Sequence, residues 1–254
     1  MLLAHELIGH PHDPAVILVH GMTDSRRMWH PLLRPLAKHH FVLAVDLRGH
    51  GESEPGDAYD PISYATDVVE TAAALTIGDA LVVGHSLGGV VATAFAAITP
   101  CRAVLNIDQP LQLSSFKEML GQLEPMLKGD AESFELGLET MFAAMEGPLA
   151  ADERARLRSH RRADQEVVLA TWAAVFDSTA AELDAAVAAM AAGITVAYLS
   201  LHGMDPGAGY EAWLQRLVPT ATIETWPGMG HYLHLVDPVR FLARLAEFEA
   251  MARR

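Results

Sequence analysis

The chain has 254 residues, 51% hydrophobic and 20% charged, so it is too apolar for a disordered protein and long enough for one α/β domain with a full core. Lys and Arg number 18 against 32 Asp and Glu, and the formal net charge of −14 at pH 7 argues against nucleic acid or an anionic membrane as a partner. No apolar run is long enough for a membrane span, the N-terminus does not resemble a signal peptide, and the single Cys101 cannot form an internal disulfide. We therefore expect a cytoplasmic monomer or homodimer that acts on a small molecule.

Short apolar runs alternate with amphipathic segments along the first 110 residues. Residues 1–9 can supply one or two short strands, and continuous apolar runs predict buried strands at 15–19, 41–45 and 81–83. A further strand is expected at 103–107, which is apolar except for Asn106. Helices are expected between them over 27–38, from a cap at Ser63 to about Leu75, and from residue 87 to Ile98. This alternation predicts a mostly parallel, doubly wound sheet of the α/β class.

The alternation stops between residues 111 and 193, where only helical patterns occur. Strands resume at 194–199 and 221–226, separated by a helix near 210–217, and Asp237 with Pro238 begins a last helix that runs towards Met251. We therefore expect a core made of residues 1–110 and 194–254, with a helical cap at 111–193.

The run Gly84–His85–Ser86–Leu87–Gly88 fits the G-x-S-x-G pattern of a nucleophile elbow, in which a serine stands on a tight turn between a strand and a helix. A serine hydroxyl is a poor nucleophile at neutral pH and needs a base, which in turn needs an acid to orient it. His231 follows a predicted strand and is expected to be the base.

Two aspartates compete for the role of acid. Asp205 follows the strand at 194–199 and gives the chain order Ser86, Asp205, His231, which is one of the known triad orders. Asp108 follows the strand at 103–107 and is the rival acid. The sequence favours Asp205 because it follows its strand and is near His231 in the chain, and Asn variants of each would decide.

Four segments resemble the capped α/β-hydrolase family over nearly the whole chain. They are His20–Gly21, residues 46–53 (Asp-Leu-Arg-Gly-His-Gly-Glu-Ser), residues 84–89 (Gly-His-Ser-Leu-Gly-Gly) and residues 230–238 (Gly-His-Tyr-Leu-His-Leu-Val-Asp-Pro). The resemblance implies that the backbone N–H groups of Met22 and Leu87 form an oxyanion hole. It implies no metal and no cofactor.

Several side chains are candidates for the substrate pocket, namely His85, Phe116, Met141, Phe142, Trp172 and Met229. The basic run at 153–162 could hold a carboxylate or phosphate of a substrate, although a solvated helix face is the commoner meaning of such a run. His10 and His12 have no further ligand cluster near them and are interpreted as a surface turn rather than a metal site.

These residues favour a serine hydrolase that cleaves small to medium, mostly apolar carboxylic esters or lactones through an acyl-enzyme on Ser86. A carbon–carbon bond hydrolase, a thioesterase and a cofactor-free perhydrolase use the same triad and stay open as alternatives. A haloalkane dehalogenase is disfavoured because residue 86 would then be Asp. From another class, the chain could be a ligand receptor with a slow or silent triad.

Overall fold

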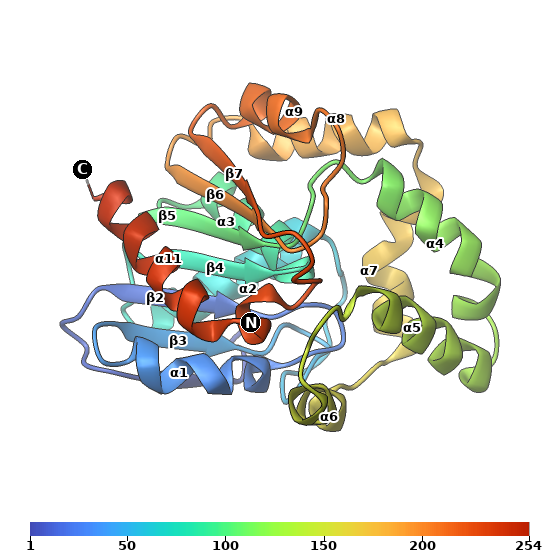
Figure 1. Ribbon diagram of the computed structural model, residues 1–254, viewed down its shortest axis with the longest axis horizontal. Coiled ribbons are helices and arrows are strands. Elements are labelled where there is room, and N and C mark those ends of the chain that lie inside the picture. The colour runs from blue at the N-terminus through green and yellow to red at the C-terminus, as the bar shows by residue number, and fades with distance from the viewer. Residues whose placement is uncertain (254) are drawn as a thin grey trace.

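A seven-stranded sheet forms the centre of the molecule (Figure 1). The computed structural model describes residues 1–253. The strands are β1 (His5–Ile8), β2 (Ala15–Val19), β3 (Phe41–Val45), β4 (Leu81–His85), β5 (Ala103–Ile107), β6 (Ala197–His202) and β7 (Ala221–Thr225). They lie in the order β1-β3-β2-β4-β5-β6-β7, and all pairs are parallel except β1 with β3. The predicted α/β class with a mostly parallel sheet is confirmed.

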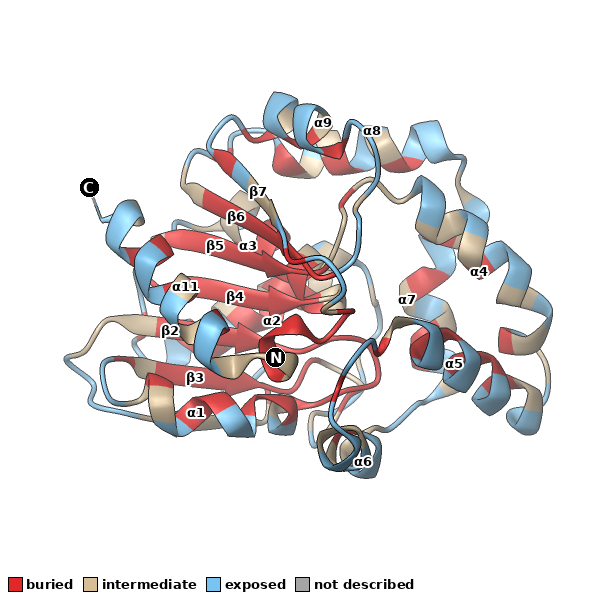
Figure 2. Ribbon diagram, viewed as in Figure 1, coloured by how far each residue is buried: buried red, intermediate tan, exposed pale blue. Residues whose placement is uncertain are grey.

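Helices cover both faces of this sheet, which explains why its strands are continuous apolar runs. The covering helices are η1 (Arg26–Trp29), α1 (His30–Leu36), α2 (Pro61–Ala74), α3 (Leu87–Ile98), α9 (Tyr210–Leu217), α10 (Leu233–Val236) and α11 (Pro238–Ala252). Alternate strand residues point to opposite faces. Ile17 belongs to the buried cluster that includes residues of α2, α3 and α9, whereas Val16 and Leu18 belong to the cluster that includes residues of α1 and α11. Figure 2 shows the central strands buried along most of their length.

Five helices lie between β5 and β6. They are α4 (Ser114–Leu127), α5 (Ala131–Met145), α6 (Ala151–His160), α7 (Gln165–Asp177) and α8 (Ala180–Ala191). In Figure 1, α4, α5 and α7 stand beyond the carboxyl ends of the parallel strands. The last helix, α8, differs from the others because Val187 and Ala191 pack into the core cluster with α3. No helix within residues 1–253 is both long and apolar enough to cross a membrane.

Some element boundaries differ from those expected. The predicted cap Ser63 lies inside α2, and Asp60 caps that helix instead, accepting hydrogen bonds from the backbone of residues 62 and 63 at 3.0 Å each. Pro61 then takes the first helical position, where its missing N–H costs nothing. The predicted strand at 194–199 starts three residues later, because Ile194 closes a turn after α8 by donating its N–H to the Ala191 carbonyl at 3.1 Å.

Candidate active site

Ser86 stands at the turn between β4 and α3, with φ 53° and ψ −123°. This positive φ is rare for a residue with a side chain and stores about 1–3 kcal/mol of strain. The turn is possible only because the residues two positions before and two positions after Ser86 are glycines. A Cβ on Gly84 would lie 1.8 Å from the Gly88 carbonyl oxygen, and a Cβ on Gly88 would lie 2.2 Å from the Val19 carbonyl oxygen. The local sequence therefore fixes a strained, projecting serine.

The His231 ring contacts a carboxylate through its Nδ1 atom. Its Nδ1 lies 2.7 Å from Oδ2 of Asp108, the first residue after β5. The other oxygen of Asp108 accepts hydrogen bonds from the backbone N–H groups of Gly203 and Met204 at 2.8 and 3.1 Å. Burial alone would raise the pKa of the Asp108 carboxyl, but the hydrogen bond from His231, its charge and the two amides hold that pKa below its usual value. Asp108 is therefore placed as a charged hydrogen-bond partner of His231.

Asp205, which the sequence favoured as the acid, makes its hydrogen bond elsewhere. Asp205 is exposed, and its carboxylate accepts a hydrogen bond from the backbone N–H of Gly207 at 2.9 Å. The loop after β6 turns so that the amides of Gly203 and Met204 face Asp108, and the hydrogen bond of His231 Nδ1 goes to Asp108. The carboxylate that contacts His231 is that of Asp108, the rival acid.

The loop after β2 packs directly against the elbow. A Cβ on Gly21 would lie only 3.0 Å from the Cβ of Ser86, so Gly21 permits this approach. Met22 follows it, is buried and lines the cavity beside Ser86 and Leu87. Leu87 is the first residue of α3, where backbone N–H groups have no partner within the helix. Both residues thus lie where an oxyanion hole is expected, and the role of their N–H groups stays a prediction.

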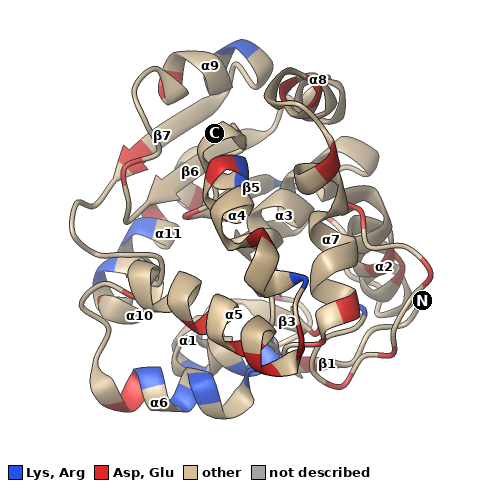
Figure 3. Cartoon of the chain, turned by 90° about the vertical axis from the view of Figure 1, so that its right-hand side faces the viewer, with Lys and Arg blue, Asp and Glu red and all other residues tan. Residues whose placement is uncertain are grey.

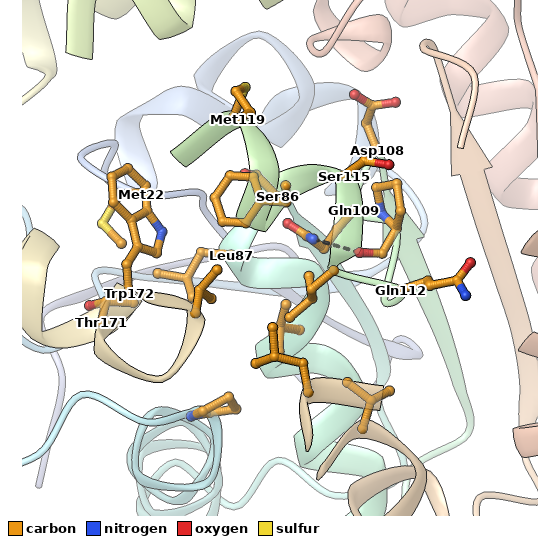
Figure 4. Close-up of a pocket in the computed structure, with 18 of the residues that line it drawn as sticks. Met22, Ser86, Leu87, Asp108, Gln109, Gln112, Ser115, Met119, Thr171 and Trp172 are labelled. Atoms are coloured by element: carbon orange, nitrogen blue, oxygen red, sulfur yellow. Dashed lines mark hydrogen bonds between the residues drawn. The ribbon is translucent and has the colours of Figure 1, made fainter. Parts of the chain in front are cut away.

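A cavity of about 500 Å³ lies between the elbow and helices α4, α5, α7 and α8, and Ser86, Asp108 and His231 all contribute to its wall. Of the predicted pocket residues, Phe116, Met141, Phe142 and Trp172 line it. Figure 4 shows Met22 and Trp172 on one side of Ser86, with Asp108, Gln109 and Gln112 on the other. Further lining residues that the sequence reasoning missed include Tyr59, Ser115, Thr171, Met190 and Met204. Gln109 could have been found, because it directly follows Asp108.

Two predicted pocket residues lie elsewhere. His85 is buried beneath the triad, where its Nε2 lies 2.9 Å from the His231 carbonyl oxygen, which it can contact only as a donor. Its pKa lies well below the usual value, because burial and the neighbouring histidines disfavour a charge. Met229 is half-buried and packs on the core cluster that contains α11. His85 therefore supports the loop that carries His231, and neither residue faces the cavity.

The basic run at 153–162 joins the cap to the core rather than facing the cavity. Arg156 donates to the backbone carbonyls of Arg27 and Met28 at 2.7 and 3.0 Å. Arg161 donates to the Tyr232 hydroxyl at 2.7 Å and lies 3.6 Å from the Asp24 carboxylate. Figure 3 shows the basic residues of α6 along one edge of the cap. No arginine of this run lines the cavity, so the expected alternative of a substrate anion site is not supported. Within residues 1–253 no group of three or more His, Cys, Asp or Glu could hold a metal ion.

Comparisons with known proteins agree with this geometry. A model described as the alpha/beta hydrolase family matches residues 16–245. The 2-(acetamidomethylene)succinate hydrolase of Mesorhizobium japonicum is 29% identical over 245 residues, which cover 92% of this chain and 87% of that protein. The crystal structure of an enol-lactonase from Burkholderia xenovorans LB400 superposes with a TM-score of 0.76 at 19% identity, covering 97% of this chain and 95% of the other. An esterase from Rhodococcus sp. ECU1013 superposes with a TM-score of 0.75 at 20% identity, covering 98% and 97%.

Proposed function

The chain belongs to the alpha/beta hydrolase family, and on this premise we propose that it is a serine hydrolase that cleaves carboxylic esters or lactones through an acyl-enzyme on Ser86. The observation that carries the proposal is the 2.7 Å hydrogen bond between His231 and the buried Asp108, together with the strained Ser86 that lines the same cavity. Each group follows a separate strand, and all three open on one cavity.

The reaction proceeds in two halves. The Ser86 hydroxyl attacks the ester carbonyl carbon, and His231 Nε2 takes the hydroxyl proton while Asp108 stabilises the resulting imidazolium. The tetrahedral oxyanion accepts hydrogen bonds from the backbone N–H groups of Met22 and Leu87, each worth about 3–4 kcal/mol of barrier lowering. The carbon–oxygen bond to the alcohol breaks, and the alcohol leaves with the proton from His231. Water then attacks the acyl-enzyme by the same steps and releases the acid.

The cavity supports small to medium, mostly apolar substrates. Its volume of about 500 Å³ lies in the range of pockets for small molecules, and its wall is mainly aliphatic, aromatic and thioether side chains. The uncharged polar groups near Ser86 come from Gln109, Gln112, Ser115 and Thr171. An ester with an acyl chain of several carbons would bury that chain against the cap.

Two observations weigh against the alternatives. Six methionines line the cavity, namely Met22, Met119, Met141, Met145, Met190 and Met204. A perhydrolase makes peracid, which oxidises thioethers to sulfoxides, so this wall suits a hydrolase better. A receptor that only binds its ligand has no need for the strained backbone of Ser86. The 29% identity to a named hydrolase over most of both chains also supports turnover.

The proposal is tested with the intact protein and 4-nitrophenyl hexanoate, a γ-lactone, the corresponding thioester and a vinylogous diketone. We expect release of 4-nitrophenol, loss of that release in Ser86→Ala, and labelling of the wild type at Ser86 by an alkyl fluorophosphonate. A diketone or thioester turned over far faster than both the ester and the lactone would move the assignment to those classes. No turnover and no labelling would overturn it.

A further inference from the structure

The wall of the active-site cavity carries no cation. Among the described residues that line it there is no Lys or Arg, and the ionisable groups nearest Ser86 are His231 and two carboxylates, Asp108 and Asp205. His231 and Asp108 are already paired with each other. A substrate carboxylate that entered this cavity would find no positive side chain to neutralise it.

Two cations that lie next to residues of the cavity wall are committed elsewhere. Lys117 follows the lining residue Phe116, but its ammonium donates to the backbone carbonyls of Val175 and Phe176 at 2.8 and 3.0 Å. Arg161 lies with its guanidinium carbon 3.9 Å from the centre of the Phe142 ring, and it also bonds Tyr232. Because Phe142 lines the cavity and Arg161 does not, the phenyl ring stands between the guanidinium and the substrate.

Asp205 adds a negative charge at the exposed part of the wall. It lies in the loop after β6, and one hydrogen bond from Gly207 N–H at 2.9 Å leaves most of its carboxylate open to solvent. The chain as a whole carries a formal charge of −14, so an approaching anion is repelled both locally and at long range.

We propose that this enzyme selects uncharged acyl groups and excludes substrates with a free carboxylate, and that Asp205 is a specificity-determining residue for this exclusion. The inference rests on the proposed ester hydrolysis and specifies which substrate charge that reaction accepts. Burying a charge without a partner is far more costly than burying a neutral group of the same shape. The dicarboxylate named for the Mesorhizobium japonicum relative is therefore not a substrate of this chain, despite 29% identity.

The test uses two esters that differ in one terminal group. 4-Nitrophenyl hexanoate ends in a methyl group, and 4-nitrophenyl hemiadipate has a carboxylate in its place; the methyl ester of the hemiadipate controls for size and polarity. We expect kcat/KM for the hexanoate and for the methyl ester to exceed that for the hemiadipate by about 100-fold, as an unpaired charge in an apolar cavity predicts. Equal values for the hexanoate and hemiadipate, or a preference for the anion, would overturn the exclusion.

The role of Asp205 is read from the ratio of kcat/KM for the hemiadipate to that for the hexanoate. Asp205→Asn should raise the ratio about threefold, and Asp205→Lys should raise it about tenfold. Added salt should bring the ratios of the wild type and the variants closer together, because it screens the charge at residue 205. Glu211→Gln removes an exposed carboxylate of α9 that does not line the cavity, and it should leave the ratio unchanged. A ratio that responds equally to Glu211→Gln and Asp205→Asn would remove Asp205 from this role.

Binding separates this inference from the proposed function. Calorimetric titration of Ser86→Ala with methyl hexanoate and with monomethyl adipate should give heat of binding for the neutral ester alone. If the wild type hydrolyses neither ester, the proposed hydrolase fails, while the titration still decides the charge selection. If monomethyl adipate binds as tightly as methyl hexanoate, charge selection fails whatever the turnover shows.

Discussion

The Nδ1 atom of His231 lies 2.7 Å from Oδ2 of Asp108, although the two residues are 123 positions apart in the chain. The neighbouring loop holds this carboxylate through the amides of Gly203 and Met204. Asp108 itself has a φ of 50°, so the chain adopts a strained turn directly after β5 to present it. Three hydrogen bonds and a strained turn thus fix the Asp108 carboxylate. Its Oδ2 faces His231, and its Oδ1 accepts from the backbone amides of Gly203 and Met204.

Asp108→Asn is expected to lower kcat for 4-nitrophenyl hexanoate by about 10⁴-fold, because an amide cannot stabilise the imidazolium and favours the wrong tautomer. Asp205→Asn should retain most of the kcat, since that carboxylate bonds Gly207 N–H rather than the histidine. Steady-state kinetics of the two purified variants, with circular dichroism to confirm folding, make the comparison. A larger loss in Asp205→Asn than in Asp108→Asn would reverse the assignment of the acid.

The acid shows where sequence reasoning stops. Buried strands such as 15–19, 41–45 and 103–107 were predicted at their observed bounds, because a strand covered on both faces must be a continuous apolar run. The acid was not, because Asp108 and Asp205 each follow one of two adjacent strands. Which carboxylate reaches the histidine depends on the turn of the loop at residues 203–204. The amides of this loop contact Asp108 across about a hundred positions of the chain, and no local sequence pattern encodes such a contact.

The cap illustrates a second limit, which concerns helix faces. The structure divides the apolar residues of α5 into two sets. Phe134 and Leu138 pack in the cluster inside the cap without reaching the cavity, whereas Met141 and Phe142 belong to that cluster and also line the cavity. Amphipathic spacing indicates that a helix has an apolar face, but it does not tell which part of that face meets substrate.

Gly88→Ala is expected to abolish activity and to destabilise the fold by more than about 3 kcal/mol, because its Cβ would lie 2.2 Å from the Val19 carbonyl oxygen and the backbone would have to move. Urea denaturation measures the loss. Gly121→Ala in α4 is the matched control: nothing lies within 4 Å of its Cβ, so a gain of about 0.5–1 kcal/mol is expected from helix propensity. Equal effects of the two substitutions would contradict the packing argument for the elbow.

Arg161→Met is expected to lower the free energy of unfolding by about 2–3 kcal/mol, because it leaves the buried Asp24 carboxylate without its cation. Burial raises the pKa of Asp24, while the nearby Arg161 opposes that rise. Arg158→Met is the control. Arg158 is exposed and lies 3.6 Å from Glu146, and the variant leaves that buried carboxylate its closer ion pair with Arg154 at 2.8 Å, so a loss of less than about 1 kcal/mol is expected.

The double variant Asp24→Asn with Arg161→Met sharpens this test. Without the aspartate there is no uncompensated charge to bury, so the double variant should be more stable than Arg161→Met alone. Urea denaturation of the four proteins forms a complete cycle. A double variant whose loss equals the sum of the two single losses would mean that Asp24 and Arg161 act independently.

Five buried histidines predict a steep loss of stability in acid. Burial is the main cause that lowers their pKa values from the ordinary 6.5, to about 4 for His20 and His202, to about 3 for His50 and His234, and well below the ordinary value for His85. Below pH 6.5 the unfolded chain binds protons that the folded chain does not, so the free energy of unfolding falls as the pH falls. Each histidine contributes up to about 1.4 kcal/mol per pH unit until its folded pKa is reached.

His234→Phe isolates one of these contributions. Neither ring nitrogen of His234 has a hydrogen-bond partner among the described residues, and the ring packs 5.1 Å from Trp29 and 5.8 Å from Phe241, measured between centroids. A phenyl ring suits this setting, so stability at pH 7.5 should be equal or higher, and the slope of stability between pH 6 and 5 should fall by about 1.4 kcal/mol per unit. Urea denaturation across pH 7.5 to 5 measures the slope, with His12→Gln in the exposed turn as the control. An unchanged slope in His234→Phe would mean that His234 is protonated equally in the folded and unfolded chains.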